Sequence, residues 1–101
     1  MERSGEQPIK AILPAILRHA QRRYEVLQTI RRRWARLVGK RLAAHSKPVS
    51  LRRGRLVVHV DQPGDSFLLS YQRERLLEQL RTSTKGTVEE LVIRPGELPT
   101  E

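Results

Sequence analysis

The chain has 101 residues, 38% of them hydrophobic, no Cys, and 20 Lys and Arg against 11 Asp and Glu, which gives a formal net charge of +9. This length fits one compact domain, and the absence of Cys excludes disulfides, thiolate zinc sites and cysteine nucleophiles. No run approaches the roughly twenty apolar residues of a membrane-spanning helix, and residues 11–17 lack a signal-peptide cleavage site, so we expect a cytoplasmic protein with no membrane partner.

The positive charge is concentrated in the first part of the chain. Positions 1–60 hold 15 of the 20 basic residues against three Glu, a formal charge of +12, whereas positions 61–101 hold five basic and eight acidic residues, a charge of −3. Such a field attracts a polyanion to one surface and leaves another surface for a different partner. Nucleic acid is the first polyanion to consider.

Two helices are predicted before position 40. Residues 1–7 are polar and expected to be flexible, and apolar residues at helical spacing predict a short helix over 8–20, although it contains Pro14. A second helix is expected to bend or end at Gly39 and to carry its apolar residues on one face, namely Leu27, Ile30, Trp34 and Val38. The basic residues on the other side are Arg22, Arg32, Arg33, Arg36 and Lys40.

After position 48 the hydrophobic period changes to two, which predicts two strands. Val49 and Leu51 are expected on one side of the first strand. The second strand alternates, with one side formed by Leu56, Val58 and Val60. Arg53-Gly54 supplies the glycine that a tight reversal needs, so the strands should form a hairpin. The basic residues around its tip are Arg52, Arg53 and Arg55.

The remainder predicts one helix and one strand. Pro63 and Gly64 end the second strand, and Asp65 or Ser66 is expected to cap a helix that runs to about position 82. Its buried face should hold Leu69, Leu76, Leu77 and Leu80. A third strand is predicted over 88–94, followed by a flexible tail over 95–101. The order helix, helix, hairpin, helix, strand favours a single α+β domain with a three-stranded sheet.

The basic side is the strongest functional signal, because Arg offers planar, multi-donor contacts to phosphate. Aromatic residues that could stack on bases are scarce, and Trp34 lies on the apolar helix face, which favours a core role. Phe67 and Tyr71 share a helix side that differs from the leucine face. They are candidates for a contact with a protein partner, and packing against the first helices is the alternative.

No pattern in the sequence indicates catalysis, a metal site, a cofactor or a small-molecule substrate. The three histidines, His19, His45 and His59, lack zinc-ligand spacing. Glu74 and Glu78 lie close to arginines, which favours a surface charge lattice over an acid/base pair. Residues 85–87 have the wrong order for a phosphate-binding loop. We therefore expect a protein that is not an enzyme.

An extended pattern resembles a known family. The matching residues are Trp34, Val38-Gly39, Leu42-Ala43, His45-Ser46, Pro48, Leu51, Arg53-Gly54, the run 56–60, Ser66-Phe67, Leu69, Leu76-Leu77, Leu80 and the run 91–94. With these residues in order, positions 34–94 resemble the DciA family, a bacterial domain associated with loading or operating the replicative helicase. The resemblance implies a KH-like α+β domain over 8–94, DNA binding, and a hexameric DnaB-type helicase as partner. The chain has no Gly-x-x-Gly loop, so KH-like would describe topology and not the binding mode of KH domains.

The resulting hypothesis is a nucleoid-associated DNA-binding adaptor of bacterial replication. Phosphates would be held by the basic residues of the helix and the hairpin tip, while the less basic second half meets the helicase. Four residues would set the geometry, namely Trp34, Gly39, Pro48 and Gly54. Two alternatives stay open at this point: an RNA-binding or ribosome-associated factor, and a module whose basic face docks an acidic protein.

Overall fold

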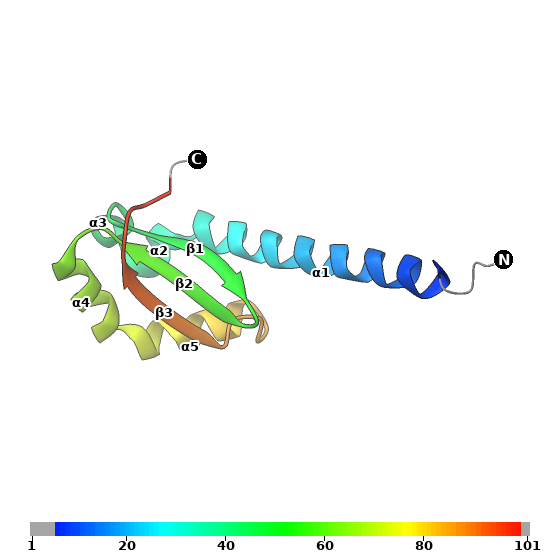
Figure 1. Ribbon diagram of the computed structural model, residues 1–101. Coiled ribbons are helices and arrows are strands. Elements are labelled where there is room, and N and C mark those ends of the chain that lie inside the picture. Colours follow the sequence, from blue (N-terminus) through cyan, green and yellow to red (C-terminus); the bar gives the residue numbers. More distant parts are fainter. Residues whose placement is uncertain (1–5, 100–101) are drawn as a thin grey trace.

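Between residues 6 and 99, which the computed structural model describes, with side chains described for 14–99, five helices and three strands follow one another. In chain order they are α1 (Glu6–Arg32), α2 (Trp34–Val38), α3 (Lys40–Ala43), β1 (Ser46–Arg52), β2 (Arg55–Val60), α4 (Pro63–Tyr71), α5 (Arg73–Ser83) and β3 (Glu90–Pro95). The predicted α+β class with a three-stranded sheet is confirmed (Figure 1).

The sheet has the order β1-β2-β3. β1 and β2 are antiparallel, and β3 lies parallel to β2 on its other side. The turn between β1 and β2 consists of Arg53 and Gly54, with φ angles of 52° and 79°. Two positive φ angles match the two-residue turns that suit the right-handed twist of a hairpin. The predicted hairpin is therefore confirmed.

A β-bulge in β1 corrects one expectation. The register passes from Pro48 opposite Val58 to Ser50 opposite Val57, so Val49 is an extra residue. An inserted residue shifts the alternation of side chains by one position. Pro48 and Leu51 are therefore buried, while Val49 is only half-buried. The prediction that Val49 and Leu51 share one side is wrong for this reason.

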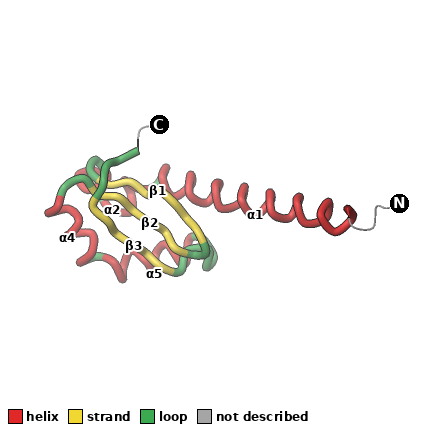
Figure 2. The backbone as a smooth tube through the Cα atoms, viewed as in Figure 1, coloured by secondary structure: helices red, strands yellow, loops and turns green. Residues whose placement is uncertain are grey.

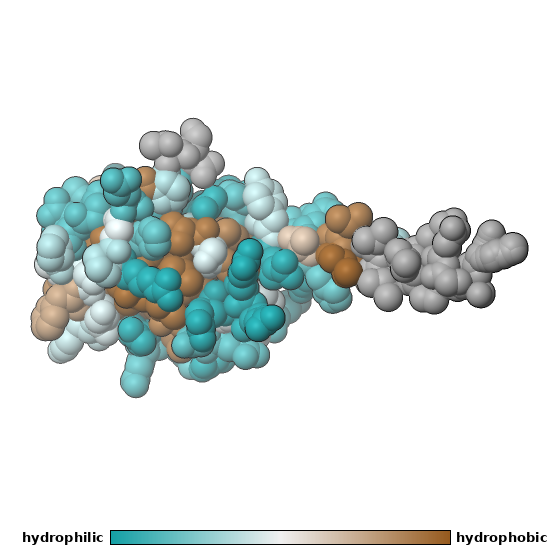
Figure 3. Space-filling view, viewed as in Figure 1, coloured by the Kyte–Doolittle hydropathy of each residue, from teal (hydrophilic) through white to brown (hydrophobic). Residues whose placement is uncertain are grey.

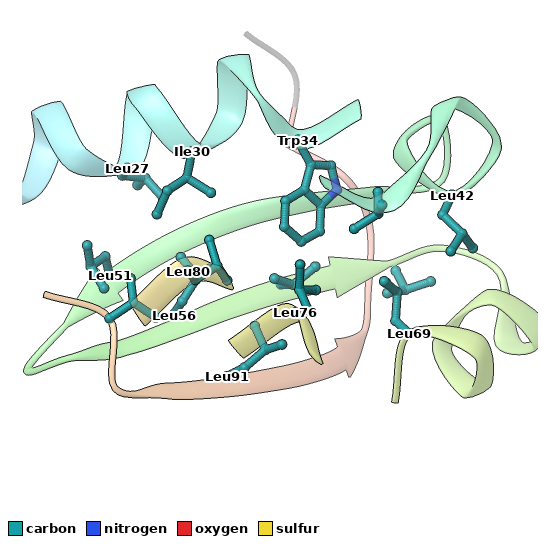
Figure 4. Close-up of a cluster of buried hydrophobic side chains, with 14 residues drawn as sticks. Leu27, Ile30, Trp34, Leu42, Leu51, Leu56, Leu69, Leu76, Leu80 and Leu91 are labelled. Atoms are coloured by element: carbon teal, nitrogen blue, oxygen red, sulfur yellow. The ribbon is translucent and has the colours of Figure 1, made fainter. Parts of the chain in front are cut away.

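The helices cover one face of the sheet and leave the other open. α1 packs along β1, while α4 and α5 pack under β2 and β3 (Figures 1 and 2). The core lies between these layers. Figure 4 shows Leu27, Ile30 and Trp34 pointing from the helices toward Leu56 and Leu91 of the sheet. The helix faces predicted to be apolar are thus the ones that are buried.

Trp34 is fixed in the core by a hydrogen bond as well as by packing. Its side chain is 4% exposed, and its Nε1 donates to Ser46 Oγ at 2.9 Å. Ser46 Oγ in turn donates to the carbonyl of Leu42 at 2.6 Å. A buried indole N–H without a partner would cost stability, so this chain of bonds satisfies the polar atom that burial removes from water. The core role predicted for Trp34 is confirmed.

α1 corrects the prediction of a helix boundary near position 20. It continues without a break from Glu6 to Arg32, with Pro14 inside it. The sequence between Ala15 and Val38 contains neither Gly nor Pro, so nothing ends the helix there. The break comes at Arg33, before α2, and Gly39 with φ 93° then separates α2 from α3. Of the residues 1–7 expected to be flexible, 1–5 lie outside the described residues.

The helix predicted to span 66–82 is in fact two helices. Gln72, with φ −95° and ψ 9°, separates α4 from α5. α4 begins earlier than predicted because Pro63 occupies its first position, where a missing N–H costs nothing. Gln62 stands at the N-cap and makes no side-chain cap bond, so the predicted cap at Asp65 or Ser66 is wrong. Asp65 is instead buried in the first turn, where its Oδ1 lies 3.4 Å from Arg41 Nη1.

In the C-terminal segment, the third strand begins later than predicted, and the chain then continues across the sheet. β3 begins at Glu90, while Val88 is buried in an extended loop and its N–H donates to Thr84 Oγ1 at 3.1 Å. Of the tail predicted over 95–101, Pro95 ends β3, and residues 100–101 lie outside the described part. Between them, the carbonyl of Glu97 lies 3.1 Å from His59 Nδ1, and Lys47 Nζ donates to the carbonyl of Pro99 at 3.4 Å.

Candidate nucleic-acid interface

The hairpin turn gathers three predicted cations at one end of the sheet. Arg52 and Arg55 are directly opposite in the β1–β2 register, and Arg53 occupies the turn between them. All three are exposed. We call them the hairpin group. Arg55 Nε lies 3.2 Å from Glu90 Oε1, whereas among the side chains of residues 14–99 neither Arg52 nor Arg53 has a carboxylate within ion-pair distance.

A cavity of ≈ 490 Å³ lies beside the hairpin group on the open face of the sheet. We call it the arginine cavity. Its lining residues are Ser50, Arg52, Arg53, Arg55, Val57, Glu90 and Arg94. Arg94 and Glu90 are not among the residues predicted from the sequence, because both belong to β3 and reach the site only through the parallel pairing with β2. The alternation of apolar and polar residues in β3 predicts a strand, but it does not predict which strand pairs with β3.

The remaining predicted cations lie mainly at the opposite end of β1. Arg31 Nε donates to the carbonyl of Pro48 at 2.8 Å, which fixes the end of α1 beside the start of β1. The exposed cations here form the helix-end group, which consists of Arg32, Arg33, Arg36 and Lys40. At about 3.3 Å per residue, the seven residues of β1 separate this end from the hairpin group by roughly 20 Å. The structure therefore divides the predicted basic side into two groups.

Most of the helix-end group is unpaired. Arg32 Nη2 donates to Thr29 Oγ1 at 3.2 Å. Arg33, Arg36 and Lys40 have no carboxylate within ion-pair distance in the described part of the chain. Arg22 belongs to neither group, because it lines a separate cavity of ≈ 330 Å³ between α1 and the loop after α5. With respect to the described side chains, three cations are therefore available to bind an anion at this end.

Phe67 and Tyr71 lie on the surface of α4. Their side chains are 73% and 84% exposed. The alternative that they pack against the first helices is therefore wrong. α4 carries no basic residue, and its one acidic residue, Asp65, is buried. Neither residue of this aromatic pair is charged, and neither belongs to a cationic group.

The titratable side chains outside the cationic groups include two surface pairs. Among the side chains of residues 14–99, no group of three or more His, Cys, Asp or Glu could hold a metal ion. His45 Nδ1 lies 3.1 Å from Asp61 Oδ1 on the exposed surface, and Glu78 pairs with Arg81 at 3.6 Å. These are ordinary surface pairs, which contribute little to stability. None of the helices in the part of the chain that is described is long and apolar enough to span a bilayer.

Comparison with protein families gives one match that covers nearly the whole chain. The family described as Dna[CI] antecedent, DciA, matches residues 8–93. The chain belongs to the DciA family. The match covers α1 from position 8 onward as well as positions 34–93 of the region that carries the resemblance. Membership supports a role of the helicase-loader type in DNA replication, and the DciA family is one of loaders and adaptors. No curated protein matches the chain significantly.

Proposed function

We propose that this protein is a non-enzymatic DNA-binding adaptor that associates with the DnaB-type replicative helicase and assists its loading or operation. Family membership supports the link to replication. The observation that carries the DNA-binding half is the pair of cationic groups at the two ends of β1. Such a protein would work on chromosomal DNA and hence at the nucleoid.

Unpaired surface arginines favour phosphate as a ligand for a specific reason. A cation that already pairs with a carboxylate must give up that contact to bind an anion. Arg33, Arg36, Arg52 and Arg53 have no such contact in the described residues. Each can therefore meet a phosphate directly and release a condensed counterion, which drives association and makes it depend on salt. This binding requires no base contact, so we expect little sequence preference.

The aromatic pair on α4 is our proposed contact for the helicase. Exposed aromatic side chains are enriched among the residues that dominate protein–protein binding energy. Phe67 and Tyr71 lie four residues apart and both are mostly exposed. Because neither residue belongs to a cationic group, we propose that one molecule holds DNA and the helicase at the same time.

The proposal is tested by reversing charges in the helix-end group. Arg33→Glu with Arg36→Glu should weaken binding to a fluorescent single-stranded DNA and lower the slope of log K against log salt by about 1.4, two contacts at 0.7 each. The matched control is Arg73→Glu with Arg75→Glu, which reverses two exposed charges on α5. Circular dichroism checks that both variants fold. Equal binding by the two folded variants would remove this group from the interface.

The same assay separates the alternative ligands. Matched single-stranded DNA, duplex DNA and RNA are titrated in parallel, with purified helicase in a further arm. Tighter binding of RNA than of DNA would favour the transcript-associated alternative. Helicase binding without binding of any nucleic acid would favour a protein-interaction module instead.

A further inference from the structure

The hairpin end of the sheet gathers three arginines around one turn, and the carboxylate of Glu89 packs beside Gly54 in that turn. Arg52 and Arg55 are directly opposite one another in an antiparallel pair, an arrangement that destabilises a sheet when the charges are alike. Arg53 adopts a φ of 52°, which is uncommon for residues other than Gly, Asn and Asp. Both features act against stability at one place. An anionic ligand would relieve the first of them.

The arginine cavity gives such a ligand a defined position. Arginines from β1, the turn, β2 and β3 line it, and Ser50 and Val57 complete its wall on the open face of the sheet. Figure 3 shows this face with hydrophobic surface over the strands and hydrophilic side chains at its border. Several guanidinium groups around one concave site match the several oxygens of a phosphate group. Arg94 contributes from β3 and has no ion pair with any described residue.

Among the described residues that line the cavity, Glu90 is the one carboxylate. Its Oε1 lies 3.2 Å from Arg55 Nε, and the two residues are opposite one another in the parallel β2–β3 register. The two side chains are 54% and 57% exposed. Exposed pairs of this kind are weak because water screens them. A phosphate that contacts several arginines at once can therefore displace Glu90 from Arg55.

We propose that the arginine cavity binds one phosphodiester group of a nucleic-acid strand, and that Glu90 competes with this phosphate for Arg55. The inference rests on the proposed function and adds a position, a ligand group and an internal competitor to it. The bound strand lies against the open face of the sheet. In this mode the hairpin tip is not inserted into a groove of the nucleic acid.

Two single substitutions with matched controls test the proposal by fluorescence anisotropy on a single-stranded DNA. Arg94→Gln should weaken binding roughly threefold to tenfold and lower the salt slope by about 0.7. Its control is Arg73→Gln, which removes one exposed charge from α5. Glu90→Gln should strengthen binding about twofold to fivefold by releasing Arg55. Its control is Glu74→Gln, which removes one exposed negative charge from α5.

The outcomes distinguish this inference from the proposed function. Wild-type protein that binds no DNA would refute the proposed function itself. If the wild type binds DNA but Arg94→Gln and Glu90→Gln each have the same DNA affinity as their controls, only the cavity is refuted. The effect of Arg33→Glu with Arg36→Glu on DNA binding would then remain.

A third arm separates the possible sources of phosphate. At equal ionic strength, inorganic phosphate should weaken DNA binding by the wild type slightly more than chloride does. In Arg94→Gln, phosphate and chloride should weaken DNA binding equally. Binding of inorganic phosphate that Arg94→Gln abolishes while DNA binding is unchanged would overturn the assignment to a strand. An acidic peptide that loses affinity in Arg94→Gln while DNA does not would assign the cavity to a protein ligand and equally overturn it.

Discussion

The distance between the two cationic groups predicts a dependence of binding on strand length. β1, which is roughly 20 Å long, separates the hairpin group from the end of the sheet where Arg31 holds the end of α1, next to the helix-end group in sequence. A stacked strand advances about 3.4 Å per nucleotide, so about six nucleotides are needed to reach from one group to the other. A strand of four nucleotides should contact one group at a time, whereas a strand of twelve should contact both.

The salt dependence gives this prediction a magnitude. If each group contributes about three phosphate contacts, the slope of log K against log salt is about −2 for the short strand and about −4 for the long one, at 0.7 per contact. Raising the salt from about 50 to about 200 mM should therefore weaken binding about 20-fold for the short strand and about 300-fold for the long one.

The assay is an anisotropy titration of the labelled 4-mer and 12-mer at several salt concentrations. Arg33→Gln, Arg36→Gln and Lys40→Gln, made together, should reduce the slope of the 12-mer to that of the 4-mer. Arg73→Gln with Arg75→Gln serves as the control for loss of exposed charge elsewhere. Equal slopes for the two strand lengths in the wild type would refute the reasoning, because they would mean that no strand contacts both groups.

Three further predictions concern the core, the turn and the aromatic pair. Trp34→Phe should lower the free energy of unfolding by about 1–3 kcal/mol in a urea titration, and by less when Ser46 is already Ala, because the bond from Nε1 to Ser46 Oγ is then absent. Gly54→Ala should lower the midpoint of unfolding by an amount equivalent to about 1–2 kcal/mol, since φ is 79°, whereas Gly64→Ala, at a position with open space and no positive φ, should not destabilise the protein. Phe67→Ala with Tyr71→Ala should leave the unfolding midpoint and DNA affinity unchanged but weaken helicase capture on beads; unchanged capture would move the helicase contact elsewhere.

Local patterns in the sequence were enough to find most elements of this fold. Leu27 and Ile30 recur at helical spacing, and the residues from Leu56 to Val60 alternate with a period of two. Each pattern arises because a single helix or strand buries one face in the core. The turn at Arg53-Gly54 was predictable because glycine tolerates the positive φ that a two-residue hairpin requires.

The boundaries of the helices and the alternation of side chains along β1 were less predictable, because both depend on packing between elements. The break at Gln72 contains no Gly or Pro that would predict it from the sequence. It allows α4 and α5 to pack against the sheet as two separate helices. The bulge at Val49 likewise leaves the composition of β1 unchanged and is visible only in its pairing with β2. Both features are set by contacts between elements.

The sequence by itself determined that the charge is one-sided, that the domain is α+β, and that it resembles the DciA family, because these properties depend on residue identity and order. Only the tertiary structure decided where the charges meet. It separated the helix-end group from the hairpin group by the length of β1, and it brought Arg94 and Glu90 to the hairpin by placing β3 parallel to β2. The pairing of β2 with β3 joins residues 35 positions apart, and no local pattern in the chain encodes which strand will be the neighbour.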